Sequence, residues 1–154
     1  ITHNYQLSGS STRDYNGKWI GENGPKISEL TVAQLKQFDV GGLDSRSIYG
    51  ASYPEQEFLS EIRIPKLSEL LDLACLPKGQ NLFLLMEIKS DGSLKVTKIV
   101  SQIVDEIRKR KLGNRTVLHS FDWGLLKECH RLAPEIPRSF LSQIPENCDE
   151  TGRY

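Results

Sequence analysis

One stretch of sequence decides the fold of this chain: Leu82-Phe83-Leu84-Leu85-Met86-Glu87-Ile88. All of its residues except Glu87 are apolar, and they occupy consecutive positions rather than alternate ones. This pattern is typical of a strand that is buried on both faces of a parallel sheet. We therefore predict a strand at 82–88. Its parallel neighbours require helices as connections, and the flanking sequence contains them.

The helix after this strand has the clearest pattern. It is predicted by an apolar stripe with helical spacing: Val96, Ile99, Val100, Ile103, Val104 and Ile107. Basic residues 108–111 suit the negative end of the helix dipole, and Gly113 is the predicted C′ residue. On the other side of the strand, Leu67, Leu70, Leu71 and Ala74 share the face of an earlier helix that ends before Pro77.

The same alternation continues towards the carboxyl terminus. Residues 116–120 predict a second strand and 138–141 the start of a third, with a helix over 123–132 between them. Asp122 is the predicted N-cap of that helix. Strands and helices that alternate with short connections form right-handed βαβ units, so the fold class is α/β. In this class ligands bind beyond the carboxyl ends of the strands.

The residues before 67 form a different kind of segment. Residues 6–27 are rich in Ser, Gly and Asn, which favour turns, and a second loop covers 41–65. Between these loops we predict one short helix over 28–35. Thr31 is its plausible N-cap, and Gln34 completes a capping box.

Composition excludes several classes of function. The chain has 154 residues, with 20 Lys and Arg against 20 Asp and Glu, so its formal net charge is zero. We therefore expect no nucleic-acid partner. No apolar run approaches the roughly 20 residues of a membrane helix, so no membrane span is expected. Cys75, Cys129 and Cys148 show neither a disulfide framework nor metal spacing. The chain begins at Ile1, which suggests that the natural start lies upstream.

Glu87 is the sharpest anomaly, because it is a carboxylate near the end of the most apolar strand. Side chains alternate along a strand, so Glu87 and Lys89 point to the same face. A buried carboxylate is costly unless a cation or a donor compensates it. One interpretation is an ion pair within the strand. The other is a metal-ligating carboxylate, with the lysine ready for an anionic group.

Histidines and loop aromatics are the remaining candidates. His3 follows Ile1-Thr2, which is consistent with the end of a strand, where a histidine can act as general acid or base. His119 also ends a strand and is a rival. His130 lies within a helix and is expected at the surface. The aromatics of the loops, Trp19, Tyr49 and Tyr53, either cover a substrate or anchor the loops to their own core.

Several short motifs, taken in order, resemble the glycerophosphodiester phosphodiesterase family. They are Thr2-His3 with Leu7, Thr12-Arg13-Asp14 with Asn16-Gly17-Lys18-Trp19, Leu30-Thr31 to Phe38-Asp39-Val40-Gly41, Ile64-Pro65-Lys66-Leu67, Met86-Glu87-Ile88-Lys89 and Ser120-Phe121-Asp122-Trp123. Residues 49–56, Tyr-Gly-Ala-Ser-Tyr-Pro-Glu-Gln, look like the loop of the bacterial subgroup. The resemblance covers essentially the whole chain.

The resemblance implies a (β/α)8 barrel, a TIM barrel, that hydrolyses glycerophosphodiesters to glycerol 3-phosphate and an alcohol. It implies a small-molecule substrate and a divalent metal, Mg²⁺ or Ca²⁺, held by three carboxylates, with two histidines as acid and base. His3 matches the second histidine, Glu87 the third metal carboxylate and Lys89 the lysine near the phosphate. His119 falls outside the catalytic positions of the family. The resemblance favours a periplasmic or secreted protein over a cytoplasmic one.

The chain departs from the family pattern in two ways. Asn4 replaces the aspartate that usually follows the histidine, and the upstream His-Arg-Gly and Glu-x-Asp motifs are absent. A barrel of this type needs about 250 residues. We therefore expect one domain over 1–154 that is truncated at both ends, an incomplete barrel without the first and last strands. We expect the isolated chain to be inactive.

Two alternatives to this activity stay open. One is a phospholipase D-like relative of the same fold that acts on intact lipid, such as a sphingomyelinase D or a phosphatidylinositol-specific enzyme. The other is a catalytically dead barrel that serves as a binding module, for which Asn4 is the motivating residue. The oligomeric state is open as well.

Overall fold

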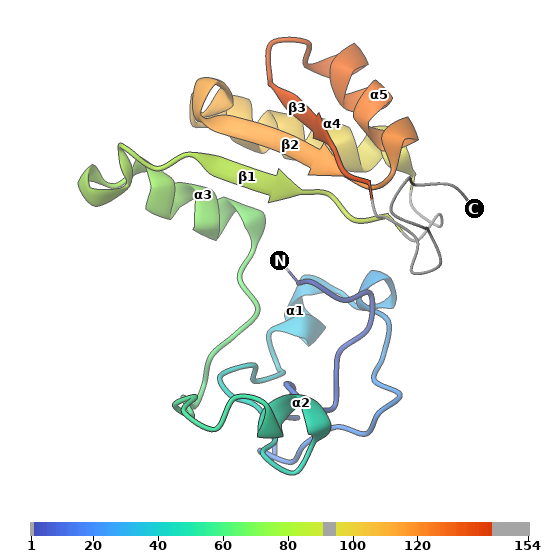
Figure 1. Ribbon diagram of the computed structural model, residues 1–154, viewed down its shortest axis with the longest axis vertical. Helices are drawn as coiled ribbons and strands as arrows, with labels where there is room; N and C mark the ends of the chain where they lie inside the picture. Colours follow the sequence, from blue (N-terminus) through green and yellow to red (C-terminus); the bar gives the residue numbers. More distant parts are fainter. Residues whose placement is uncertain (1, 91–94, 143–154) are drawn as a thin grey trace, which may run out of the picture. The chain divides into compact units, whose positions relative to one another are not determined.

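Three parallel strands form the sheet of the described residues (Figure 1), in the order β1 (Leu84–Glu87), β2 (Thr116–Ser120) and β3 (Arg138–Phe140). The structure is a computed structural model that describes residues 2–90 and 95–142. The chain divides into unit 1 (Ile1–Lys66) and unit 2 (Leu67–Tyr154), and each is described by itself. The prediction of one domain over 1–154 stays a prediction.

Helices cover one face of this sheet in unit 2. They are α3 (Leu67–Cys75), α4 (Val96–Lys109) and α5 (Trp123–Leu132), with short 3-10 turns η2 (Pro77–Gly79) and η3 (Gly113–Arg115). The predicted stripe of α4 points inward, and its residues Val100, Val104 and Ile107 are buried. They pack with Leu118 of β2 and with residues of α3 and α5 in one core. The predicted order of helices and strands is confirmed.

The prediction that the first strand is buried on both faces is wrong for this structure. Leu84 and Met86 of β1 pack against the core, but Leu85 between them is 66% exposed. The reason is that the helices of unit 2 cover one face only. Residues that pair across a parallel sheet point to the same side, so Glu87 and its partner His119 share the uncovered face with Leu85.

The end of α4 also differs from the prediction. Lys111, rather than Gly113, adopts the left-handed conformation after the helix, with φ of 56°. The amide of Lys111 donates to the carbonyl of Arg108 (2.9 Å), and the amide of Leu112 donates to the carbonyl of Ile107 (3.1 Å). These two bonds form a Schellman motif, which lets Leu112 fold back into the core, where it is buried. Gly113 begins η3 instead.

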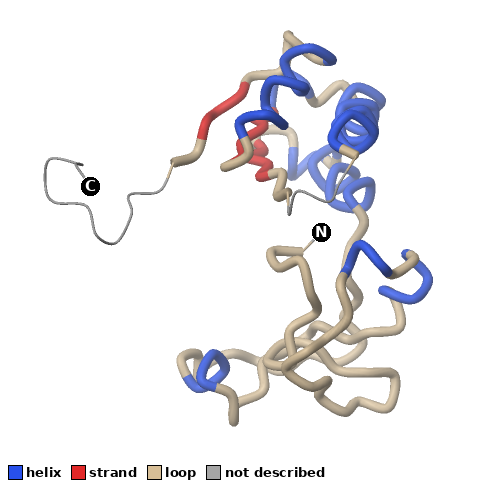
Figure 2. Tube along the Cα trace, turned by 90° about the vertical axis from the view of Figure 1, so that its right-hand side faces the viewer, coloured by secondary structure: helices blue, strands red, loops and turns tan. Residues whose placement is uncertain are grey.

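Unit 1 is mostly loop (Figure 2), with one 3-10 turn, η1 (Ile27–Glu29), and two short helices, α1 (Val32–Leu35) and α2 (Ile48–Ala51). The capping box of α1 is confirmed, because the Thr31 side chain accepts from the Gln34 amide and the Gln34 side chain accepts from the Thr31 amide. The helix is shorter than predicted, since Leu30 before it is extended. The predicted loops on both sides of it are confirmed.

A buried ion pair joins the loops of unit 1. Arg13 Nη2 lies 2.9 Å from Asp39 Oδ2, and about a tenth of each side chain is exposed. Asp39 also accepts the amides of Gly41 (2.9 Å) and Glu61 (2.7 Å). Arg13 lies 3.8 Å from the ring centroid of Phe58. These contacts connect segments far apart in the sequence, so they hold together a unit that has little regular structure.

Neither described cysteine forms a disulfide. Cys75 is an exposed free thiol, and Cys129 is a buried one. Cys148 lies outside the described residues. Within the part of the chain that the structure describes, no helix is long and apolar enough to cross a bilayer.

Candidate active site

Glu87 and Lys89 form an ion pair at the carboxyl end of β1. Lys89 Nζ donates to Glu87 Oε1 at 2.7 Å, and about a quarter of each side chain is exposed. The prediction that both side chains point to one side is confirmed. Their position beyond a strand end is where α/β proteins bind ligands.

The end of β2 holds this segment in place. The hydroxyl of Ser120 donates to the carbonyl of Ile88, and the amide of Ile88 donates to the carbonyl of His119 (2.9 Å). Ser120 is buried, and its oxygen also accepts the amide of Asp122 (3.0 Å). Asp122 caps α5 through the amide of Leu125, as predicted. The motif that begins at Ser120 therefore anchors the backbone from which Lys89 extends.

His119 lies closer to the ion pair than the sequence pattern indicated. It is the register partner of Glu87 on β2 and lies on the same uncovered face of the sheet. The sequence predicted that His119 ends a strand. It could not predict that His119 pairs with Glu87, because register between strands depends on tertiary packing.

His3 belongs to unit 1 and is exposed at the chain's amino-terminal end. It lies in a bend, so the predicted strand end at this residue is not observed, and Ile1 lies outside the described residues. A strand needs a ladder partner, and the backbone pairing in this part of unit 1 begins only at Tyr5, whose carbonyl accepts the amide of Ile27 (2.9 Å). His3 Nδ1 lies 2.8 Å from Asn4 Oδ1. An amide oxygen only accepts, so the ring makes this hydrogen bond in the tautomer that carries its proton on Nδ1.

A cavity of about 700 Å³ lies next to His3 within unit 1. Hydroxyl groups dominate its polar lining, from Ser8, Ser10, Ser11 and Thr12, and Tyr49 lies at its wall. Most of the remaining wall is apolar, so the hydroxyls and the imidazole are a few polar groups in an apolar cavity, which is typical of small-molecule sites. The sequence did not indicate this cavity, because its walls come from separate loops.

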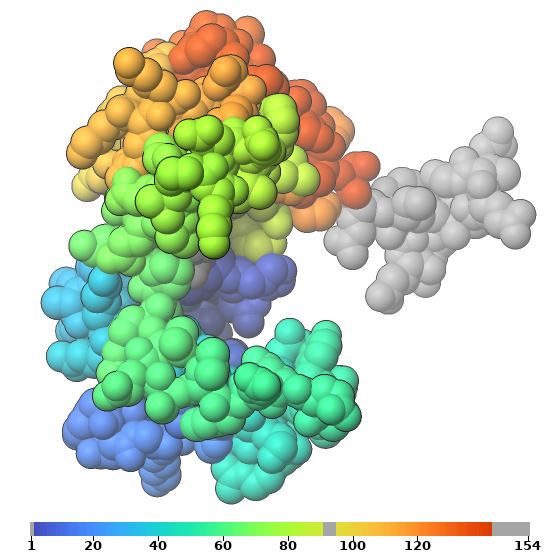
Figure 3. Space-filling view, turned by 90° about the vertical axis from the view of Figure 1, so that its left-hand side faces the viewer, coloured from blue at the N-terminus to red at the C-terminus, as the bar shows by residue number. Residues whose placement is uncertain are grey.

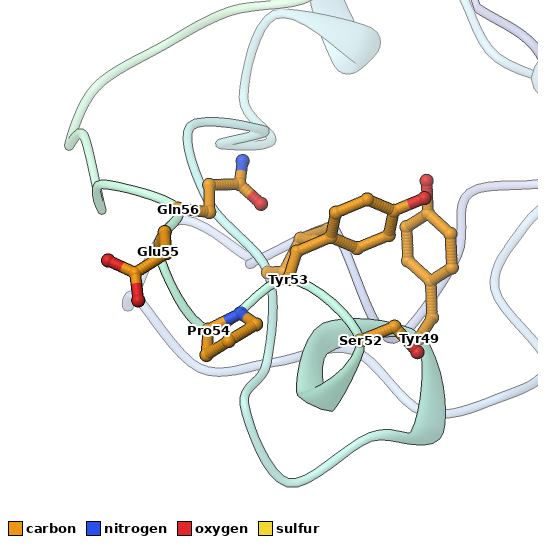
Figure 4. Close-up of a pocket in the computed structure, with 7 residues that line it drawn as sticks. Tyr49, Ser52, Tyr53, Pro54, Glu55 and Gln56 are labelled. Atoms are coloured by element: carbon orange, nitrogen blue, oxygen red, sulfur yellow. The ribbon is translucent and has the colours of Figure 1, made fainter.

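A second, open pocket of about 590 Å³ adjoins α2 (Figure 4). Tyr49 and Tyr53 line it together with Ser52, Glu55 and Gln56. The two rings meet edge to face, with centroids 5.2 Å apart. Trp19 behaves differently, because it packs edge to face against Phe58 at 6.2 Å and so anchors its loop.

The described residues do not by themselves make a metal site. Among residues 2–90 and 95–142, no group of three or more His, Cys, Asp or Glu side chains has a geometry that could hold a metal ion. Glu87 supplies one carboxylate, and in this structure that carboxylate is paired with Lys89. A divalent ion needs further oxygen ligands.

Comparison with known proteins identifies the family. The model of the glycerophosphoryl diester phosphodiesterase family matches residues 5–151. A crystal structure from Silicibacter pomeroyi DSS-3, assigned as a glycerophosphoryl diester phosphodiesterase, is 42% identical to the chain. The match covers 97% of this chain and 52% of that one, with a TM-score of 0.89. A comparison with curated protein sequences found no significant match.

These matches also bear on the fold. The chain spans about half the length of the Silicibacter protein. Its three parallel strands with helices on one face are part of a TIM barrel, so the predicted class, an incomplete α/β barrel, is confirmed. The chain belongs to the glycerophosphoryl diester phosphodiesterase family.

Proposed function

We propose that the protein containing this chain hydrolyses glycerophosphodiesters to glycerol 3-phosphate and an alcohol. Membership of the family supports the reaction, and the observation that carries it is the Glu87–Lys89 pair beyond the end of β1. A strand end that presents both a carboxylate and an ammonium group suits a ligand that brings a cation and a phosphate together. Export to the periplasm or out of the cell stays a prediction.

Glu87 is proposed as one ligand of a divalent metal, Mg²⁺ or Ca²⁺. Both ions prefer oxygen ligands, and a carboxylate near a strand end is a suitable one. The other ligands have to come from outside the set of residues described, because that set contains no cluster of three. This is also the reason to expect that the isolated 154-residue chain does not turn over.

Lys89 is proposed to bind a phosphate oxygen of the substrate. Its ammonium group now lies 2.7 Å from the Glu87 carboxylate, which limits its motion to the region beyond β1. A substrate phosphate offers further acceptors to the same ammonium group. A fixed positive charge in this place stabilises negative charge as it develops on phosphoryl oxygens.

His3 is proposed to give a proton to the oxygen of the leaving alcohol. Asn4 orients the ring through Nδ1, so that Nε2 carries the transferable proton when the ring is protonated. The partner of the ring is therefore a neutral amide, where the family usually has an aspartate.

The test is release of glycerol 3-phosphate by the full protein, assayed with its divalent metal present. We expect His3→Ala to lower kcat by roughly 10²- to 10⁴-fold, the usual contribution of a general acid. We expect Lys89→Met to lower it by about 10²-fold, and Glu87→Ala to abolish most of the activity. Glu135→Gln is the control, because Glu135 also pairs with a cation, Arg108 at 2.7 Å, but both side chains are about half exposed.

The outcomes are distinct. Wild-type rates in the His3, Glu87 and Lys89 variants would show that the site is elsewhere. A second candidate function, an inert barrel that binds glycerophosphodiesters, is favoured by the neutral Asn4 beside His3. Substrate binding in equilibrium dialysis without any turnover would support that second function.

A further inference from the structure

The pocket beside α2 has no evident structural purpose. We call it the aromatic pocket and define it by Tyr49, Ser52, Tyr53, Glu55 and Gln56. Tyr49 is 56% exposed and Tyr53 is 53% exposed, so neither ring anchors its loop in the way that Trp19 does. Figure 3 shows the teal segment that contains α2 at the surface of unit 1. Apolar groups that gather at an exposed surface mark ligand-binding grooves and other interaction sites.

The polar groups of the aromatic pocket are unused. Among the described residues, the hydroxyls of Tyr49 and Tyr53 and the carboxylate of Glu55 have no hydrogen-bond or ion-pair partner. Figure 4 shows the rings of Tyr49 and Tyr53 beside each other, whereas the Glu55 carboxylate points away from both rings. No Lys or Arg lines the pocket, so its single formal charge is the negative charge of Glu55. The exposed π faces of the two tyrosines attract a cation, and no positive side chain in the pocket opposes it.

Tyr49 connects this pocket to the candidate acid. It lines the aromatic pocket and also the cavity that contains His3. Under the function proposed above, on which this inference rests, His3 protonates the leaving alcohol. The head group is attached to that alcohol, and Tyr49 is a side chain that the cavity of His3 shares with the aromatic pocket.

We propose that the aromatic pocket binds the alcohol head group of the substrate and selects amino alcohols that carry an ammonium charge. The cation lies against the exposed rings of Tyr49 and Tyr53. Glycerophosphodiesters with a neutral polyol head group have nothing to place over the rings. They are bound by the hydroxyl-lined cavity alone.

The first experiment compares kcat/KM of the full protein for glycerophosphocholine and for glycerophosphoglycerol. Cation–π contacts at exposed sites contribute about two- to five-fold each in affinity. Tyr53→Leu should lower the choline-to-glycerol ratio of kcat/KM by about that factor. The matched control is Tyr15→Leu, a tyrosine that is 80% exposed on another loop of unit 1. It should leave the ratio unchanged.

A second experiment separates this inference from the reaction itself. Choline is titrated into the full protein, with glycerol as the comparison, and the ring resonances of its tyrosines are followed by NMR. We expect shifts of the Tyr49 and Tyr53 resonances with choline only, and weaker choline binding in Tyr53→Leu. Unchanged ratios, or no response of these rings to choline, would overturn the head-group site. Failure to cleave any glycerophosphodiester would overturn the proposed function, while the choline titration still decides whether the pocket binds a cation.

Discussion

Replacing Asp39 with Asn should destabilise unit 1 more than any other single change to its polar groups. The carboxylate pairs with Arg13 at 2.9 Å and accepts the amides of Gly41 and Glu61 on its two separate oxygens. An asparagine retains one of these oxygens and turns an NH2 group towards a donor on the other side. Arg13 is then buried without a counter-charge. Removing one partner of a buried pair costs about 3 kcal/mol or slightly more.

Replacing the other partner of the ion pair, Arg13, should cost less stability. Arg13→Met removes a side chain whose Nε is buried without a hydrogen-bond partner, and it leaves Asp39 with both backbone donors. We expect a loss of about 1 to 2 kcal/mol from this variant. In the double variant the loss of stability should be smaller than the sum of the two single losses. The difference, the coupling energy, should be about 1 to 2 kcal/mol.

The assay is urea unfolding followed by the fluorescence of Trp19, whose ring centroid lies 5.5 Å from the Arg13 guanidinium. A Trp123→Phe background leaves Trp19 as the only tryptophan, because the chain contains two. Asp44→Asn is the control: Asp44 is 15% exposed, close to Asp39, but its partner Arg46 is 77% exposed, so no buried cation is left behind and the loss should stay within about 1 kcal/mol. The reasoning is refuted if Asp39→Asn changes the free energy of unfolding by less than about 0.5 kcal/mol, or if Arg13→Met costs more.

Three further predictions concern pH, a helix end and a thiol. Burial alone would raise the pKa of Asp39, but the amides of Gly41 and Glu61 and the Arg13 guanidinium outweigh it and hold the pKa below its usual range. A carboxyl with a lowered pKa stabilises the fold above about pH 4. This stabilisation is lost as the pH falls through the pKa of the folded state. Unit 1 should therefore weaken below about pH 4 in a urea series, and Asp39→Asn should lack that part of the decline. Lys111→Gly should raise the free energy of unfolding of unit 2 by up to about 1 kcal/mol, because glycine adopts positive φ without strain; an unchanged or lower midpoint would contradict this. Burial raises the pKa of Cys129 to about 11. Iodoacetamide at pH 8 should therefore modify Cys75 and spare Cys129 until the chain unfolds, as measured by peptide mass mapping. Equal rates of modification at the two thiols would show that Cys129 is not buried.

Local patterns in the sequence were sufficient for most of the elements. The spacing of apolar residues predicted α4, and single polar residues predicted the caps at Thr31 and Asp122. The alternation of side chains along a strand placed Glu87 and Lys89 on one side, where they form their ion pair. The family motifs identified the same two residues. All of these depend on backbone periods and on neighbours within a few residues, which the sequence contains directly.

The cavity beside His3 could not be predicted from local sequence patterns. Tyr49 borders both the cavity of His3 and the aromatic pocket, and those walls come from loops without a periodic pattern. His119 lies beside Glu87 only because β1 and β2 pair in one register. Loop packing and strand register join residues that are distant in the sequence, so neither follows from local spacing.

The sequence by itself therefore determined the α/β class, the family, the helix caps and the carboxylate–lysine pair at the end of the first strand. Only the tertiary structure decided that Leu85 faces outward within its unit, that Lys111 rather than Gly113 follows α4 in the left-handed conformation, and that the exposed Tyr49 borders the cavity of His3. The physical reason is the range of the interactions. Helix and strand periods act along the chain, whereas burial, register and pocket shape are set by segments that meet only when the chain has folded.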